Sequence, residues 1–175
     1  MKLTYSLIIA GSRKQSIDLE IIKTLYDKYF DANEIVSGKE PTGIDKRGED
    51  FAKLIRLPVK AFPANWDKYG RSAGHKRNKQ MAEYADGLMA FWDMESPGTK
   101  SMIRYAQEND LEILVFDLNT HTYRINKKLK GKKWMEIKAT AEDLANVRLF
   151  VSTPMYGGIA HGQYTRSMMD LYLTC

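Results

Sequence analysis

The sequence predicts an α/β fold: a doubly wound, mainly parallel sheet of about five strands with helices on both faces. Short apolar runs alternate with segments in which apolar residues recur at helical spacing. The first run, residues 5–10, and the last, residues 112–116, are strongly apolar, which is typical of strands buried on both faces. Right-handed crossovers between parallel strands place helices on both sides of the sheet.

The order of the elements follows from this alternation. The strand over residues 5–10 ends at a glycine and leads into a helix over residues 17–30, with Ser16 as its N-cap. The spacing then predicts strands over residues 34–37, 59–62, 88–92 and 112–116, and helices over residues 45–55, 74–84 and 99–109. A weaker pattern predicts an edge strand over residues 121–125.

The length of 175 residues fits one α/β domain with an appendage, because domains usually contain about 100–200 residues. We expect the α/β domain over residues 1–118, a basic connector with the edge strand over 119–146, and a C-terminal extension over 147–175. An apolar fraction of 43% is enough to bury a proper core, so the chain is expected to fold.

Cysteine usage and hydropathy favour a cytoplasmic protein. The single cysteine, Cys175, allows no disulfide within the chain and no cysteine metal cluster. The N-terminal apolar run is too short for a signal peptide, and no stretch approaches the roughly 18 apolar residues of a membrane span. We expect no membrane contact, no metal and no cofactor.

The net charge of +5 is concentrated in one segment, from Arg124 to Lys138. Such a run can attract phosphate backbones, and Trp134 beside it could stack a base of a single strand. A solvated loop is the simpler interpretation, so nucleic acid is not the favoured partner.

The loops that follow the predicted strands contain the candidate binding residues, because ligands of open α/β sheets bind at the carboxyl ends of the strands. After the first strand, Gly11 permits close backbone approach, and Ser12 and Arg13 offer a hydroxyl and a guanidinium to phosphate. A purely structural turn fits this loop equally well. After the second strand come Gly38, Gly43 and Asp45, and Asp45 is either a helix N-cap or a ribose acceptor.

The third loop is dense in aromatic residues, glycines and cations. Trp66 and Tyr69 are candidates for stacking a base, and Gly74, Arg77 and Asn78 for a polar centre. In the alternative interpretation the two aromatic residues only cap the core. The fourth loop holds Ser96, Gly98 and Thr99, a small turn that opens a helix and can hold an anion. The four loops together predict a cleft for phosphate and base.

In this order the loops resemble the SLOG superfamily, a Rossmann-like group, and specifically its YspA/YpsA-related branch common in bacteria and their phages. The matching pieces, within residues 5–116, are 9–13, 37–38, 41–45, 62–64, Trp66, 69–70, 73–74, 77–78, Met81, 85–86, 90–92, Ser96 and 98–99. Lys39 stands where the branch usually has a second glycine, and we expect it to narrow the cleft.

The resemblance implies binding of a nucleotide or nucleotide-derived small molecule, by a sensor or a processing module. Related phosphoribohydrolases cleave an N-glycosidic bond with an arginine, which Arg77 matches, and with a glutamate, whose place Met102 takes. Asp45 is a candidate for the missing carboxylate, as are Asp67, Asp86, Asp93 and Glu95. An N-glycosidase is therefore one alternative function, with Arg77 and Asp45 as catalytic residues.

Single-stranded nucleic-acid binding is the second alternative, because a related DNA-processing protein holds single-stranded DNA. Such domains often pair, so a homo-oligomer is also expected. Residues 149–167 resemble, more weakly, the start of phage-type glycosyltransferases, in the run 151–158 followed by His161. We interpret this tail as a packing appendage or as the opening of a truncated domain.

Overall fold

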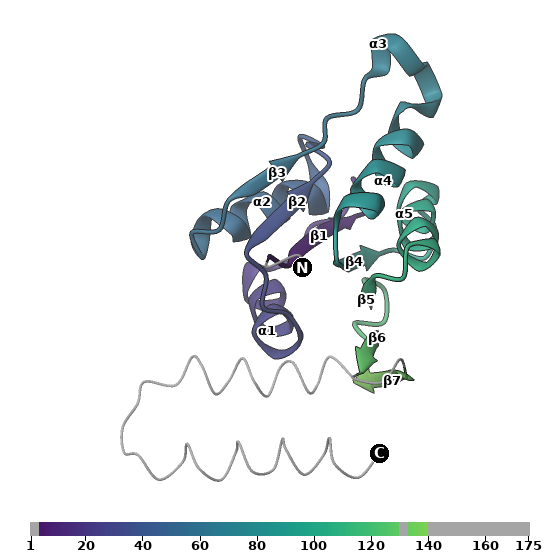
Figure 1. The fold of residues 1–175 in the computed structure, drawn as a ribbon. Helices are drawn as coiled ribbons and strands as arrows, with labels where there is room; N and C mark the ends of the chain where they lie inside the picture. The colour runs from purple at the N-terminus through teal and green to yellow at the C-terminus, as the bar shows by residue number, and fades with distance from the viewer. Residues whose placement is uncertain (1–3, 130–132, 140–175) are drawn as a thin grey trace, which may run out of the picture. The chain divides into compact units, whose positions relative to one another are not determined.

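The computed structural model describes residues 4–129 and 133–139, and every structural statement below refers to these residues. Their strands form one sheet in the order β3-β2-β1-β4-β5-β6-β7 (Figure 1). The strands are β1 (Ser6–Gly11), β2 (Glu34–Ser37), β3 (Val59–Ala61), β4 (Gly87–Trp92), β5 (Glu112–Asp117), β6 (Tyr123–Leu129) and β7 (Lys133–Ala139). The pairs among β1 to β5 are parallel, whereas β6 and β7 pair antiparallel.

Helices cover both faces of the sheet, which confirms the predicted doubly wound α/β fold. On one face, α1 (Leu19–Tyr29) and α2 (Gly43–Leu54) share a buried cluster with Leu7 and Ile9 of β1. On the other face, α4 (Ala73–Tyr84) and α5 (Pro97–Glu108) share a second cluster with Ile8 and Ala10. Successive strand residues point to opposite faces, so β1 contributes to both clusters.

Two helix starts differ from the sequence prediction. The N-cap of α1 is Asp18, whose side chain accepts a hydrogen bond from the Glu20 backbone N–H at 3.1 Å, so the prediction of Ser16 is wrong. The chain reaches Asp18 only after Ile17, which is buried in the core. Asp45 is not an N-cap either, because α2 begins two residues earlier.

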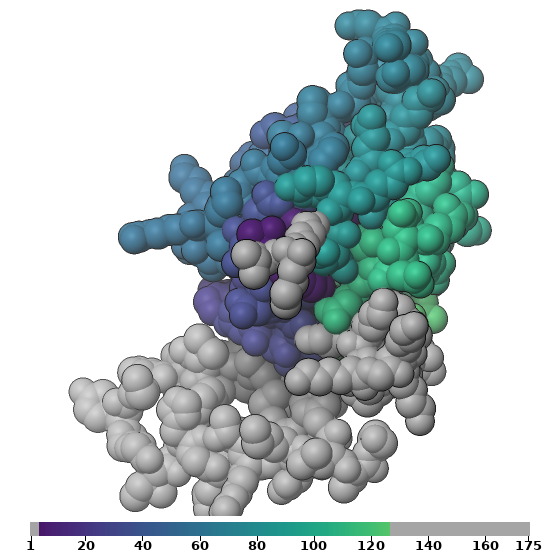
Figure 2. Space-filling model, in the orientation of Figure 1, coloured from purple at the N-terminus to yellow at the C-terminus, as the bar shows by residue number. Residues whose placement is uncertain are grey.

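The connection between β3 and α4 contains two short helices that the sequence did not reveal, α3 (Trp66–Tyr69) and η1 (Gly70–Ser72). They form the uppermost projection of the described residues in the views of Figures 1 and 2. Trp66 is 47% exposed and Tyr69 is 37% exposed. The interpretation that these two aromatic residues cap the core is therefore wrong.

The sheet continues past residue 118. Tyr123 and Ile125 of β6 are buried in the same cluster as α1, and the Tyr123 hydroxyl lies 2.9 Å from the Tyr29 hydroxyl. β6 is not an edge strand, because β7 pairs with its other side along seven residues. The basic residues of β6 and β7 lie in strands, so the prediction that they form a loop is wrong. The expectations for residues 147–175 fall outside the described residues.

Candidate functional site

The strand order sets the place of the site. From β1 the chain proceeds outward to β2 and β3, then returns to β4 on the opposite side of β1. The crevice outside the carboxyl ends of β1 and β4 is thus a topological switch point, where ligands of open α/β sheets bind.

Two glycines bring the end of β1 against the start of α2. A Cβ atom at Gly11 would meet the Phe91 carbonyl oxygen of β4 and lie 2.8 Å from Cγ1 of Ile44. Gly43 has φ +70°, and a Cβ there would lie 2.6 Å from both the Arg13 Cα atom and the Ser12 carbonyl oxygen. Only glycine permits this backbone approach, which brings the first turn of α2 beside the cleft.

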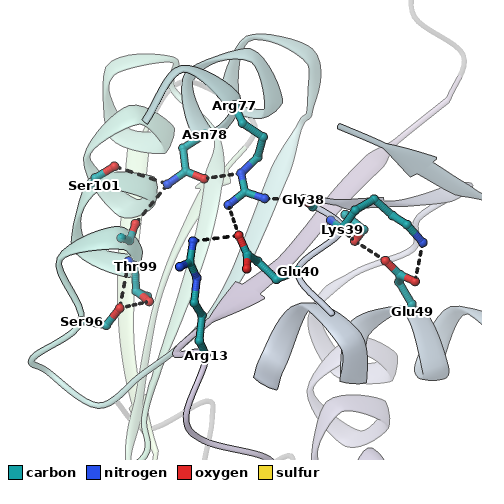
Figure 3. Close-up of polar contacts among 12 residues, drawn as sticks. Arg13, Gly38, Lys39, Glu40, Glu49, Arg77, Asn78, Ser96, Thr99 and Ser101 are labelled. Atoms are coloured by element: carbon teal, nitrogen blue, oxygen red, sulfur yellow. Dashed lines mark hydrogen bonds and ion pairs between the residues drawn. The ribbon is translucent and has the colours of Figure 1, made fainter. Parts of the chain in front are cut away.

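Arg77 of α4 is buried, at 6% exposure, and its guanidinium has three described acceptors (Figure 3). Nη1 donates to the Gly38 carbonyl, Nη2 to Oε1 of Glu40 at 3.3 Å, and Nε to Oδ1 of Asn78 at 3.0 Å. A Cβ at Gly38 would lie 2.6 Å from Cζ of Arg77, so the guanidinium fits there only because residue 38 is glycine. The buried charge is therefore fixed in one orientation.

Glu40 joins this buried arginine to an exposed one. Its Oε1 atom also accepts a hydrogen bond from Nη2 of Arg13 at 2.8 Å. The Arg13 side chain is 55% exposed, and its guanidinium lies 5.7 Å from the centre of the Trp66 ring. The loops after β1 and β2 and the start of α3 thus meet at one wall of the cleft.

Asp45, in the first turn of α2, is 6% exposed and has a raised pKa of about 6. Burial raises the pKa most, and the charge of Glu40 adds to it. The charge of Arg77, a hydrogen bond from the Gly11 backbone and the charge of Arg13 lower it. A buried carboxyl group that titrates near neutral pH in a cleft is typical of a functional site.

The opposite wall is the start of α5. Ser96 is the N-cap, and its Oγ atom accepts hydrogen bonds from the backbone N–H and the hydroxyl of Thr99 at 3.4 and 3.1 Å. Asn78 ties α4 to this turn, because its Nδ2 atom donates to the Gly98 carbonyl at 3.1 Å. The helix therefore presents its positive dipole end to the cleft.

The turn before α5 is held by Asp93. Its carboxylate accepts hydrogen bonds from the backbone N–H groups of Glu95 and Ser96, at 3.1 and 2.7 Å. Burial raises the pKa of Asp93, but hydrogen bonds from the Ser96 backbone, the Ser12 hydroxyl and the Glu95 backbone outweigh it, so the pKa is lowered. Asp93 is accordingly a charged residue that stabilises the turn.

These walls enclose a cavity of about 640 Å³. Most of the sequence-predicted site residues line it, from all four loops: Gly11, Arg13, Asp45, Trp66, Gly74, Arg77, Asn78, Ser96, Gly98 and Thr99. Four predicted residues are not among the lining residues: Ser12, Gly38, Gly43 and Tyr69. Ser12 is buried and bonded to Asp93, and the two glycines act by allowing close packing.

Lys39 does not line the cavity either, contrary to the expectation that it narrows the cleft. Its Nζ atom turns to α2 and forms an ion pair with Glu49 at 2.8 Å. The backbone of Lys39, at φ +58°, is in the left-handed region that favours glycine. Lys39 therefore has a backbone conformation that glycine adopts readily, and its side chain does not enter the cleft.

Several lining residues were not expected from the sequence: Lys14, Glu40, Arg71, His75 and Met81. Glu40 is the most important of these, because it connects two of the predicted arginines. Its position in a glycine-containing loop after a strand was the available signal. Met102 also lines the cavity, as an apolar side chain.

Within residues 4–129 and 133–139, no group of three or more His, Cys, Asp or Glu side chains is arranged to hold a metal ion. In the same part of the chain, no helix combines the length and apolar character needed to cross a membrane. In comparisons with protein-family models, curated proteins and solved structures, no match to this chain was found.

Proposed function

We propose that this protein binds a nucleotide or nucleotide-derived ligand in the cleft at the carboxyl ends of β1 and β4. The observation that carries the proposal is that glycines, cations, an aromatic ring and a helix N-terminus line one cavity at the switch point. Its volume of about 640 Å³ falls within the roughly 300–1,000 Å³ of small-molecule sites. The resemblance to the SLOG superfamily supports the same ligand class.

The two walls suit different parts of such a ligand. The start of α5 suits a phosphate, since a helix N-terminus attracts anions and the Ser96–Thr99 turn is small; Lys14 and Arg71 add positive charge to the cavity. The exposed ring of Trp66 suits a base. The Arg13–Glu40–Asp45 wall suits the hydroxyls of a sugar.

N-glycoside hydrolysis is a second candidate function, which Asp45 favours. Cleavage of the bond between the sugar and the base requires a group that takes a proton from water or gives one to the leaving base. A buried carboxyl group with a pKa of about 6 can do either near neutral pH. Asp45 would act from the α2 wall, whereas Met102 cannot serve from α5.

Nucleic-acid binding stays a prediction. Arg124 is exposed on β6, but the side chains of the following lysines lie outside the described residues.

The test is a thermal-shift panel of AMP, ADP, ADP-ribose and UDP-glucose, with chromatography of each stabilising compound after incubation. Stabilisation with the compound recovered intact supports a sensor, and release of free base supports the hydrolase. Arg71→Ala should weaken the response, because Arg71 lines the cavity. Arg104→Ala, an exposed arginine on α5 that pairs with Glu108, is the matched control. No stabilisation by any of the four compounds would contradict the proposal.

A further inference from the structure

Glu40 places a carboxylate between two guanidinium groups that could otherwise bind phosphate. Both of its described hydrogen bonds fall on Oε1, from Arg13 at 2.8 Å and from Arg77 at 3.3 Å (Figure 3). Its side chain is 15% exposed and lines the cavity. Oε2 has no hydrogen bond from the described residues, so it can accept one from a ligand.

The loop that carries Glu40 is held at several points. The Lys39 backbone N–H donates to Oγ of Ser37 at 3.0 Å, and Lys39 Nζ pairs with Oε2 of Glu49 at 2.8 Å. The Ser37 hydroxyl donates to the other Glu49 oxygen at 2.6 Å. The Gly38 carbonyl accepts a hydrogen bond from Arg77. Glu40 is therefore fixed in place as part of the wall.

The charges at this wall cancel. Arg13 and Arg77 carry two positive charges, and Glu40 and Asp45 carry two negative charges when both are ionised. A phosphate that approached the arginines would meet two carboxylates, and like charges this close repel. A sugar hydroxyl, in contrast, can donate to a carboxylate and accept from a guanidinium.

We infer that Glu40 is a specificity-determining residue that makes the Arg13–Arg77 wall accept sugar hydroxyls and reject phosphate. The ligand class is then a nucleotide-derived compound whose hydroxyls are unsubstituted at this wall and whose phosphate lies at the start of α5. The ligand orientation rests on the proposed function. The rejection of phosphate by Glu40 is independent of it.

The test uses inorganic phosphate as the probe, measured by calorimetric titration of the full chain. Glu40→Gln keeps an oxygen that can accept from both arginines but removes the charge. We expect it to tighten phosphate binding at least about tenfold, a change that corresponds to about 1.4 kcal/mol. Adding Arg13→Ala to Glu40→Gln should abolish the gain. Glu20→Gln is the charge-matched control, because Glu20 is exposed on α1 and is not among the residues that line the cavity.

A gain in Glu40→Gln that is no larger than in Glu20→Gln would overturn the inference. A second measurement needs no variant: wild-type protein should bind AMP at least about tenfold more tightly than adenosine 2′,5′-bisphosphate. Equal or tighter binding of the bisphosphate would also overturn it. If the wild-type protein binds no nucleotide, the proposed function fails, and the phosphate titration still decides the role of Glu40.

Discussion

Gly38 packs so closely against the buried guanidinium of Arg77 that a Cβ atom at residue 38 would lie 2.6 Å from Cζ of Arg77. The same Cβ would lie 2.9 Å from Oδ2 of Asp45. The position of the Arg77 guanidinium thus depends on a residue 39 positions earlier in the chain.

Gly38→Ala should displace Arg77 and lower the free energy of unfolding by about 1–3 kcal/mol, as other overpacked sites do. Urea unfolding measures the change. Gly74→Ala is the control, because a Cβ there would make only an ordinary contact, 3.5 Å from Trp66, at a helical position. That variant should be unchanged or more stable by up to about 1 kcal/mol. Equal losses in the two variants would contradict the assigned packing.

Arg77→Ala and Arg13→Ala remove two arginines that donate to the same oxygen of Glu40. Arg77→Ala should cost about 3–5 kcal/mol, because it leaves the buried Asp45 without the nearby positive charge of Arg77 and removes one of the two arginines that bind Glu40. Arg13→Ala should cost at most about 1 kcal/mol, because the Arg13 side chain is 55% exposed. Chemical denaturation of both variants provides the comparison. Similar costs would mean that burial does not distinguish the two pairs.

The pH dependence of stability should carry the signature of Asp45. Its pKa is 3.8 when unperturbed and about 6 in the folded chain, so the folded state binds more protons between these values. The free energy of unfolding should therefore fall as the pH rises through this window, by about 3 kcal/mol at about 1.4 kcal/mol per pKa unit. In the Asp45→Asn variant, the free energy of unfolding should not show this fall.

Urea unfolding between pH 4 and pH 8 tests this expectation. The stability difference between Asp45→Asn and the wild-type protein should grow in favour of the variant up to about pH 6 and then stay constant. Asp110→Asn, which removes an exposed carboxylate, should follow the wild-type profile. Parallel profiles for Asp45→Asn and the wild-type protein would show that Asp45 does not have the raised pKa.

Tyr123 tests whether β6 belongs to the core. Tyr123→Phe removes only the hydroxyl that contacts Tyr29 and should cost about 1 kcal/mol. Tyr123→Ala should cost about 3–5 kcal/mol, because the ring is 1% exposed. Thermal unfolding measures both changes. A negligible cost for Tyr123→Ala would mean that the sheet is stable without β6.

The sequence was informative about β1 to β5 because each strand and helix carries its own local pattern. Apolar runs and helical spacing predicted all five parallel strands to within two residues at either end. Because these patterns located the strands and helices, the loops that follow the strands could be placed at one edge of the sheet. Local patterns were weaker for β6, whose buried Tyr123 contacts Tyr29 across 94 residues.

The site was only partly accessible from the sequence. The loops could be named, but the role of Glu40 depends on Arg77, 37 residues later. The start of α2 depends on how closely Gly43 packs against Arg13, which no local pattern encodes. The raised pKa of Asp45 likewise results from burial, and burial of one acidic residue cannot be inferred from its neighbours in the chain.

The close packing at Gly11, Gly38 and Gly43 divides the cleft into a part that can change and a part that cannot. Any side chain at these positions would collide with neighbouring backbone or with the buried Arg77, so the packing that supports the cavity walls has almost no freedom to vary. Adaptation to a different ligand must therefore come from residues that line the cavity without supporting it, such as Lys14, Arg71 and Glu95. An engineer who wished to redirect the cleft would begin with those three side chains.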